Sequence, residues 1–177
     1  MGLENLLAQK RREILKTWFG LVIKSYPEET GAFFKQNKDH FANPVGSTIK
    51  RGLEAILKEL FQEMDPDHET LIPIMDPIIR IRAIQDFKPS EAVSFIFSLK
   101  PIIRKIAEKT FGDENVEQEL HVLDSKIDNL GLLGFDIYMA CREKIYDLKA
   151  NEVRNRTYRA FKRANLISEN SPEETDG

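Results

Sequence analysis

The sequence predicts an all-α fold, a helical bundle of about five helices with a long C-terminal helix. Apolar residues recur every three or four positions along most of its 177 residues, which is the period of a helix that buries one face. The apolar fraction of 41% and the charged fraction of 31% are typical of narrow buried stripes beside wide solvated faces. Residues 114–150 contain no proline. The length favours one domain.

The first two helices are predicted on either side of a connection. An amphipathic pattern begins at Leu3 and ends at Tyr26-Pro27, because a residue that precedes proline is disfavoured in the helical region. Residues 28–46 are predicted to be a connection in which one short helical turn can form. Ser47 is the expected cap of the second helix, and the apolar stripe of that helix runs from Ile49 to Met64.

The third helix is predicted to begin at Asp65-Pro66 and to run toward Phe87, with the aspartate as its cap and the proline at the first helical position. Pro73 and Pro77 also fall within it. Each proline removes one internal hydrogen bond, so we expect the first half of this helix to be kinked, short or 3₁₀-like.

A fourth helix is predicted from Pro89 or Ser90 to a glycine stop at Gly112, with a bend at Pro101. The long helix follows from residue 114 to about Ala150 and would span roughly 55 Å if it were continuous. Gly131 and Gly134 leave two helices meeting there as an alternative, and we favour core packing as their role.

The predicted domain organisation has three parts. Residues 1–155 form the helical domain, residues 156–167 a basic extension and residues 168–177 a disordered acidic tail. The basic run at residues 154–163 is interrupted by Tyr158 and Phe161. We interpret it as a solvated helix end, with contact to an acidic partner protein as the main alternative.

Three charged residues, Arg80, Arg82 and Asp86, stand inside one of the most apolar stretches of the chain. Arg82 and Asp86 are four residues apart and can pair on a helix, whereas Arg80 points about 200° away from Arg82. Asp86 could also accept backbone N–H groups at the head of the next helix. A buried, paired arginine is usually a structural lock, so we prefer that role to a ligand- or partner-binding site.

The sequence predicts no catalytic, cofactor or metal site. His40, His68 and His121 are far apart, and none has a second ligand at a metal-binding spacing. Cys141 lies on an apolar stripe, where cysteine usually acts as a small hydrophobic residue. Glycine-rich phosphate loops and glycine-flanked serines are absent from the sequence.

Composition also limits the partners. The net charge of −3 argues against a general nucleic-acid binder. No segment has the layout of a signal peptide or the length of a membrane span, so we expect a cytoplasmic protein.

A helical carrier of a small apolar or haem-like molecule is the alternative function, since aromatic residues could line a pocket. Those residues are Phe33, Phe34, Phe41, Phe87, Phe95 and Phe97.

The segment "IRAIQDFKPSEAVSFIFSLKPIIR" resembles the motif region of the RsbRD-type N-terminal domain, the sensor module of RsbT co-antagonist proteins. "NPVGSTIKRGLEAIL" (43–57) and "GFDIYMACREKIYDLKANEV" (134–153) agree with the same family in order and spacing. The resemblance implies an all-helical input domain that regulates an output module, with a globin-like arrangement without haem as one option. It carries over no catalytic residue and no ligand.

These observations together predict a non-enzymatic regulatory module that acts through protein contacts. The resemblance implies a signalling partner, either a kinase, a phospho-accepting protein or an anti-sigma-type regulator. The long C-terminal helix needs a partner for its apolar stripe, and we expect a homodimer through that helix. Because the chain ends about 25 residues after the last motif, we expect either a free-standing regulator or a sensor fragment of a larger protein.

Overall fold

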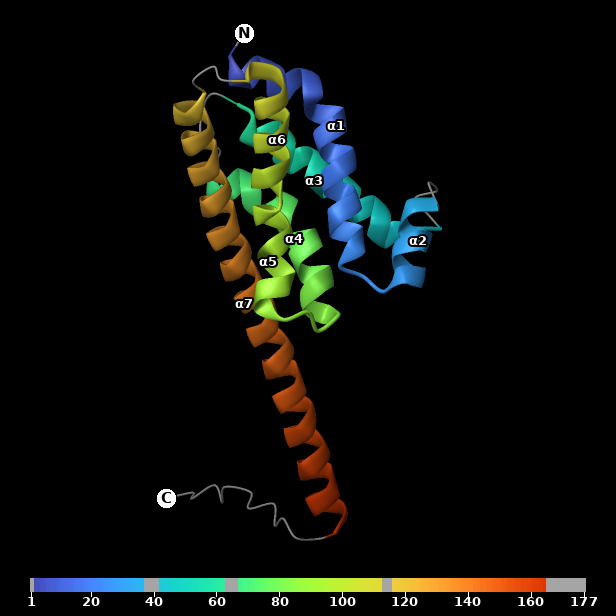
Figure 1. Ribbon diagram of the computed structural model, residues 1–177. Coiled ribbons are helices and arrows are strands. Elements are labelled where there is room, and N and C mark those ends of the chain that lie inside the picture. The colour runs from blue at the N-terminus through green and yellow to red at the C-terminus, as the bar shows by residue number, and fades with distance from the viewer. Residues whose placement is uncertain (1, 37–41, 63–66, 113–115, 165–177) are drawn as a thin grey trace, which may run out of the picture. The chain divides into compact units, whose positions relative to one another are not determined.

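The computed structural model describes residues 2–36, 42–62, 67–112 and 116–164, all as helices and their connections (Figure 1). The chain divides into two compact units, residues 1–141 and residues 142–177. The described part of the first unit holds six helices and the beginning of a seventh. The described part of the second unit is the remainder of that helix. The all-α class and the long C-terminal helix are therefore confirmed.

The first unit is built around α1, α3 and α4. Helix α1 (Leu3–Lys24) packs against α3 (Pro44–Leu60), which packs along α4 (His68–Ile84). Gly52 makes the α3–α4 approach close, because a Cβ there would lie 2.5 Å from Ile78 Cδ1. The core residues that these helices bury completely include Ile14, Trp18, Ile49, Leu53, Met75 and Ile79.

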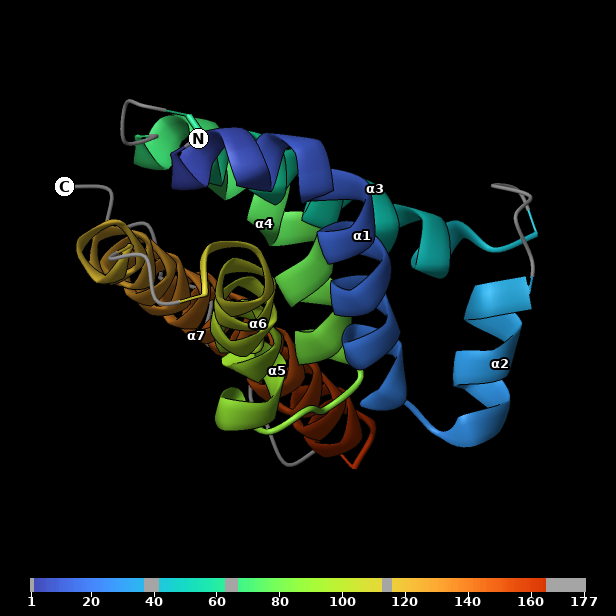
Figure 2. The same cartoon turned by 45° about the horizontal axis from the view of Figure 1, so that its top comes forward.

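Helices α5 (Pro89–Phe97) and α6 (Leu99–Phe111) lie between α1 and the first part of α7 (Figures 1 and 2). One helix was predicted over this range, with a bend at Pro101. The break instead falls at Ser98, because proline has no N–H and its ring clashes with the carbonyl four residues earlier, here that of Phe97. Gly112 ends α6 at a positive φ of 55°, so the predicted glycine stop is confirmed.

The prediction for residues 28–46 was wrong in two respects. Residues 28–46 include a full helix, α2 (Glu28–Gln36), and α3 begins at Pro44. Its cap is Asn43, whose side chain accepts the Gly46 N–H at 2.9 Å, so Ser47 is not the cap.

Helix α4 is capped by Asp67, which accepts the Thr70 N–H, whereas the predicted start at Asp65-Pro66 lies outside the described residues. Its 17 residues form one α-helix despite Pro73 and Pro77, so its first half is neither a separate short helix nor 3₁₀.

Helix α7 (Glu117–Arg163) is a single helix of 47 residues. Gly131 and Gly134 do not divide it. A Cβ at Gly131 would lie 2.1 Å from Phe97 Cζ, and one at Gly134 would lie 2.8 Å from Ile96 Cδ1. These glycines therefore allow α5 to approach α7, as the packing interpretation predicted. The acidic tail at 168–177 lies outside the described residues.

Candidate functional site

Arg82 occupies the last turn of α4 with a side chain that is 0% exposed. Its Nη2 donates to the Ser25 hydroxyl at 3.1 Å and to the Glu91 carbonyl at 3.0 Å. Ser25 caps the end of α1, and Glu91 lies in the first turn of α5. One guanidinium therefore ties together the ends of three helices.

Three aromatic rings surround this guanidinium. Its Cζ lies 4.3 Å from the ring centroid of Phe87, 5.4 Å from that of Phe95 and 5.5 Å from that of Tyr26. Each distance is within the range of a cation–π contact, which gains strength when the cation is removed from water. The rings thus supply part of the stabilisation that a carboxylate partner gives to most buried arginines.

The cluster is nevertheless incompletely paired. Among the described residues, Arg82 Nε and Nη1 and the Tyr26 hydroxyl have no hydrogen-bond partner. Burial lowers the pKa of the Arg82 guanidinium, although the nearby Tyr26 and Glu91 oppose that shift. Burial raises the pKa of the Tyr26 phenol, against the opposing positive charge of Arg82. Arginine still remains protonated, because its ordinary pKa is far above neutrality.

The connection from α4 to α5 is a tight helix stop. Asp86 adopts a positive φ of 58°, and the Phe87 N–H donates to the Arg82 carbonyl at 3.2 Å. The Asp86 N–H reaches the Ala83 carbonyl at 3.4 Å. This pair of bonds is the Schellman arrangement, in which the residue two after the cap packs on the residue three before it. Here that contact is Phe87 on Arg82.

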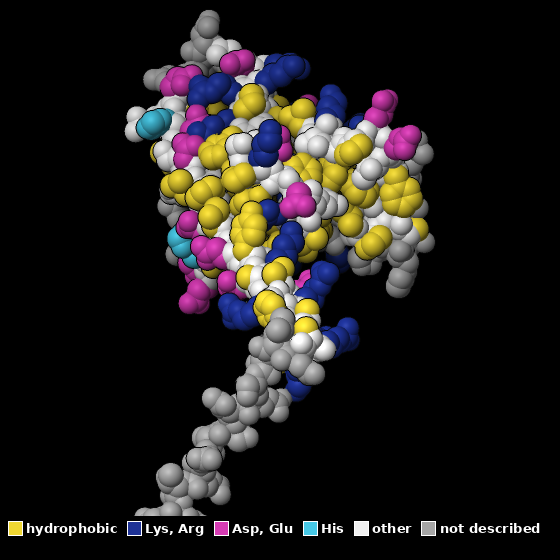
Figure 3. Space-filling view, turned by 90° about the horizontal axis from the view of Figure 1, so that it is seen from below, with side chains coloured by type: hydrophobic (Ala, Val, Ile, Leu, Met, Phe, Trp, Pro, Cys, Tyr) yellow, Lys and Arg dark blue, Asp and Glu magenta, His cyan; other side chains and the backbone are white. Residues whose placement is uncertain are grey.

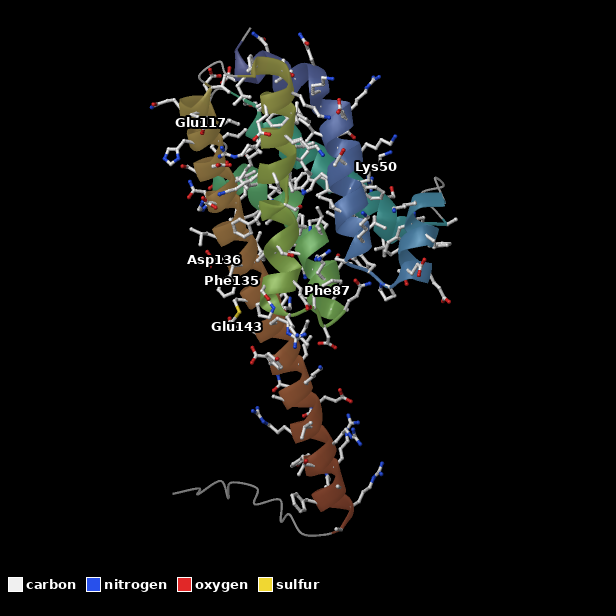
Figure 4. The ribbon with its side chains drawn as sticks, viewed as in Figure 1. Lys50, Phe87, Glu117, Phe135, Asp136 and Glu143 are labelled. Atoms are coloured by element: carbon white, nitrogen blue, oxygen red, sulfur yellow. The ribbon has the colours of Figure 1, made fainter. Side chains whose placement is uncertain are left out.

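The same turn is linked to α1 and to α7. The Trp18 indole N–H donates to the Phe95 carbonyl at 2.7 Å, and the two rings stack. The Tyr138 hydroxyl donates to the Phe87 carbonyl. Figure 4 shows Phe87 at this turn. The Arg82 cluster, defined as Arg82, Tyr26, Phe87 and Phe95, is therefore joined by one hydrogen bond to the helix that leaves the first unit.

The structure corrects one predicted pairing. Among the described residues no ion pair joins Arg82 to Asp86, because the αL turn at Asp86 ends the helix on which the two would share a face. Arg80 lies on the opposite side, as predicted. It is exposed and forms a bidentate pair with Asp76 at 3.0 and 2.8 Å. At the head of α5, the Glu91 carboxylate accepts the Lys88 N–H.

Four of the six candidate pocket phenylalanines form a continuous group through Tyr26 and Arg82: Phe33, Phe34, Phe87 and Phe95. Phe87 and Phe95 belong to the Arg82 cluster. Phe34 is buried with its ring edge-to-face against Tyr26, Phe97 lies against Gly131, and Phe33 is exposed. Phe41 lies outside the described residues. The middle of the group is occupied by the Tyr26 ring and the Arg82 guanidinium.

The three histidines and the single cysteine are the remaining candidates for a metal-binding or catalytic role. His68 and His121 are exposed, and His40 lies outside the described residues. The described part of the chain contains no group of three or more His, Cys, Asp or Glu residues that could hold a metal ion. Cys141 is half-buried beside the core. Over the same residues, no helix is both long enough and apolar enough to cross a membrane.

Helix α7 has a second apolar face, which the sequence analysis missed. Within the first unit, Leu130, Leu133 and Ile137 are buried. Leu132, Phe135 and Met139 are 66%, 44% and 38% exposed. We call these three the outward stripe. Their spacing of three and four residues is the signal that could have identified them, since it runs parallel to the buried stripe.

Figure 4 labels Phe135 and the neighbouring Asp136 on the side of α7 away from α5 and α6. Figure 3 shows exposed hydrophobic side chains among charged ones on the face that it draws.

Residues 142–163, here called the basic arm, are almost entirely exposed. They contain eight basic and three acidic residues, a net charge of +5. Tyr146, Ala150, Val153, Thr157 and Ala160 follow one another at spacings of four and three residues and so lie on one side of the helix. The run at 154–163 is helical and exposed.

The family model described as "RsbT co-antagonist protein rsbRD N-terminal domain" matches residues 12–153. The match spans the Arg82 cluster, the outward stripe and the first half of the basic arm. No curated protein and no solved structure matches the chain significantly.

Proposed function

Because the chain belongs to the RsbT co-antagonist protein RsbRD N-terminal domain family, we propose that it is a cytoplasmic, non-enzymatic regulatory module in bacterial signal transduction. Membership of the family implies a stressosome-type signalling module. The family is one of regulatory and sensor domains rather than of enzymes. The module acts by contact with other proteins: a kinase, a phospho-accepting protein or an anti-sigma-type regulator, and a second copy of itself.

The outward stripe is the observation that carries this proposal. Leu132, Phe135 and Met139 expose large apolar side chains from a helix whose opposite face is already buried in the core. Scattered exposed hydrophobic residues are ordinary, but an aligned set marks an interaction surface. An interaction through this stripe would act on the same helix that packs on α5 through Gly131 and Gly134.

The Arg82 cluster is the proposed structural lock of the module. It holds the ends of α1, α4 and α5 together, and the Tyr138 hydroxyl connects its turn to α7. A change in the packing of the cluster would therefore alter the support of α7 near residue 138. This arrangement supports transmission between the bundle and the outward stripe, with Arg82 as a positioning residue and Arg80 outside the cluster.

Partner capture tests the proposal. The tagged chain is purified from its native cell after mild cross-linking, and its partners are identified by mass spectrometry. We expect a kinase, a phospho-accepting protein or an anti-sigma-type regulator with the wild type and with the matched control Ile72→Glu, which alters an exposed residue of α4. Phe135→Glu should lose it. Equal capture by both variants, or capture of none of these classes, would contradict the proposal.

The carrier function is distinguished by a separate measurement. A helical haem carrier would show a Soret band in the visible spectrum of the freshly purified protein, and a carrier of a small apolar molecule would release that molecule on denaturation. If the chain is a regulator, we expect no Soret band and no released molecule. The Tyr26 ring and the Arg82 guanidinium occupy the middle of the group formed by Phe34, Phe87 and Phe95, so these contacts give the carrier function no support.

A further inference from the structure

We propose that the basic arm of one copy docks antiparallel on the outward face of α7, residues 117–141, of a second copy. This inference rests on the proposed function, which it deepens by naming the partner and the direction of pairing. Two observations carry it: the apolar lines on the two segments, and their opposite charges. The docking is reciprocal, because each copy has both segments, and the result is a closed dimer.

The apolar lines match when the helices run in opposite directions. We place Met139 of one copy opposite Met139 of the other. A residue that precedes position 139 in one helix then faces the residue that follows position 139 by the same number of positions in the other helix. Leu132 then lies opposite Tyr146, seven residues away on either side. Both are large, apolar and exposed. Small residues of the arm, Ala150 and Ala160, allow the two helices to come close, since side-chain size sets the distance between packed helices.

Charge decides the direction of pairing. Residues 117–141 contain five acidic residues and one basic residue, a net charge of −4, whereas the basic arm carries +5. Asp124 and Asp128 already pair with Arg104 and Lys100. When the basic residues of the whole first unit are included, residues 1–141 contain 22 acidic and 18 basic residues. The net charge of that unit is therefore also −4. Antiparallel pairing brings opposite charges together, whereas parallel pairing would place arm against arm and repel.

Disulfide trapping tests the direction. In a Cys141→Ser background, Ser125→Cys is introduced into one protein and Val153→Cys into another. Ser125 and Val153 are exposed and lie 14 residues before and 14 residues after Met139. We expect mild oxidation of the mixture to give a covalent dimer of the two different proteins at a yield about tenfold above that of either protein alone, because antiparallel docking places the two thiols within bonding distance.

Three outcomes of the trapping experiment would overturn the inference. Efficient cross-linking of Val153→Cys alone would show parallel pairing. A disulfide within one chain of the Ser125→Cys/Val153→Cys double variant would show that the arm docks on its own bundle. Absence of any cross-link, with a sedimentation coefficient of a monomer at tens of micromolar, would show that no such dimer forms.

Salt dependence is an independent test. We expect the dimer dissociation constant of the wild-type chain to rise about tenfold between about 50 mM and about 500 mM salt, since exposed ion pairs are screened. Tighter association at high salt would contradict charge-driven docking. Phe135→Glu should abolish the dimer without lowering the melting temperature, and Ile72→Glu should change neither. If a signalling partner is still captured while trapping fails, the proposed function stands and only the second copy is excluded.

Discussion

Replacement of Arg82 by alanine is the perturbation that separates a structural lock from a binding residue. The change removes the two hydrogen bonds to Ser25 and Glu91, the contacts with three rings, and all the side-chain volume beyond Cβ. It also removes two buried nitrogen atoms, Nε and Nη1, that have no hydrogen-bond partner among the described residues. The first set of effects destabilises the fold, and the last stabilises it.

The magnitudes favour destabilisation. Each hydrogen bond from a charged donor contributes about 1.5–3 kcal/mol, and the loss of packing and the cavity cost about 2–4 kcal/mol. Removal of two unpaired donors returns about 1–3 kcal/mol each. Central values leave a net loss of about 3.5 kcal/mol for Arg82→Ala. For a chain of this size, that loss lowers the melting temperature by about 7–14 °C.

The assay is urea denaturation followed by the fluorescence of Trp18, the single tryptophan, which is fully buried beside the cluster. Arg82→Met is the matched variant, because it keeps much of the volume without the charge. Its stability should stay within about 1 kcal/mol of the wild type or exceed it. Arg80→Ala removes an exposed ion pair with Asp76 and should cost less than about 1 kcal/mol.

The lock interpretation would be refuted by unchanged stability of Arg82→Ala together with loss of the captured signalling partner. That result would make Arg82 a partner-binding residue. It would also require the cluster to open, because the side chain is inaccessible in the folded state.

Three further predictions concern the surroundings of the cluster. Gly131→Ala should cost about 1–2 kcal/mol through overpacking against Phe97, whereas Gly20→Ala, with open space around it, should gain about 0.5–1 kcal/mol in helix propensity; urea denaturation measures both. Tyr138→Phe should cost about 1 kcal/mol and speed hydrogen exchange at the α4–α5 turn; unchanged exchange would sever the proposed link to α7. Burial raises the pKa of Tyr26 above its ordinary 10.0, so its contribution to stability is complete below pH 10.0 and falls as pH rises through the folded-state value. Melting curves taken up to about pH 11.5 should show a smaller alkaline loss for Tyr26→Phe, and equal losses would contradict this prediction.

The helical periodicity of the sequence was sufficient to predict the buried stripes. It identified the stripe of α3 from Ile49 onward and the opposite sides taken by Arg80 and Arg82. Spacing alone could not place the guanidinium of Arg82, because its partners come from α1 and α5, far away in sequence. The turn at Asp86 was also missed, since a positive φ is uncommon for a residue other than glycine.

The outward stripe was missed for a different reason. A spacing of three and four residues fits Leu132, Phe135 and Met139 as well as it fits Leu130, Leu133 and Ile137. Only burial distinguishes the face of α7 that packs on the bundle from the one that does not. The sequence predicted that α7 needs a partner for its apolar stripe, and the structure leaves the outward stripe exposed on the other face of the helix.

Photo-cross-linking from position 135 in the native cell tests the central claim most directly, with position 72 as the matched exposed position. The account predicts covalent adducts from position 135 to a second copy and to a kinase, a phospho-accepting protein or an anti-sigma-type regulator, and none of these from position 72. Adducts of equal yield from both positions, or none from position 135, would contradict a signalling function exerted through the outward stripe of α7.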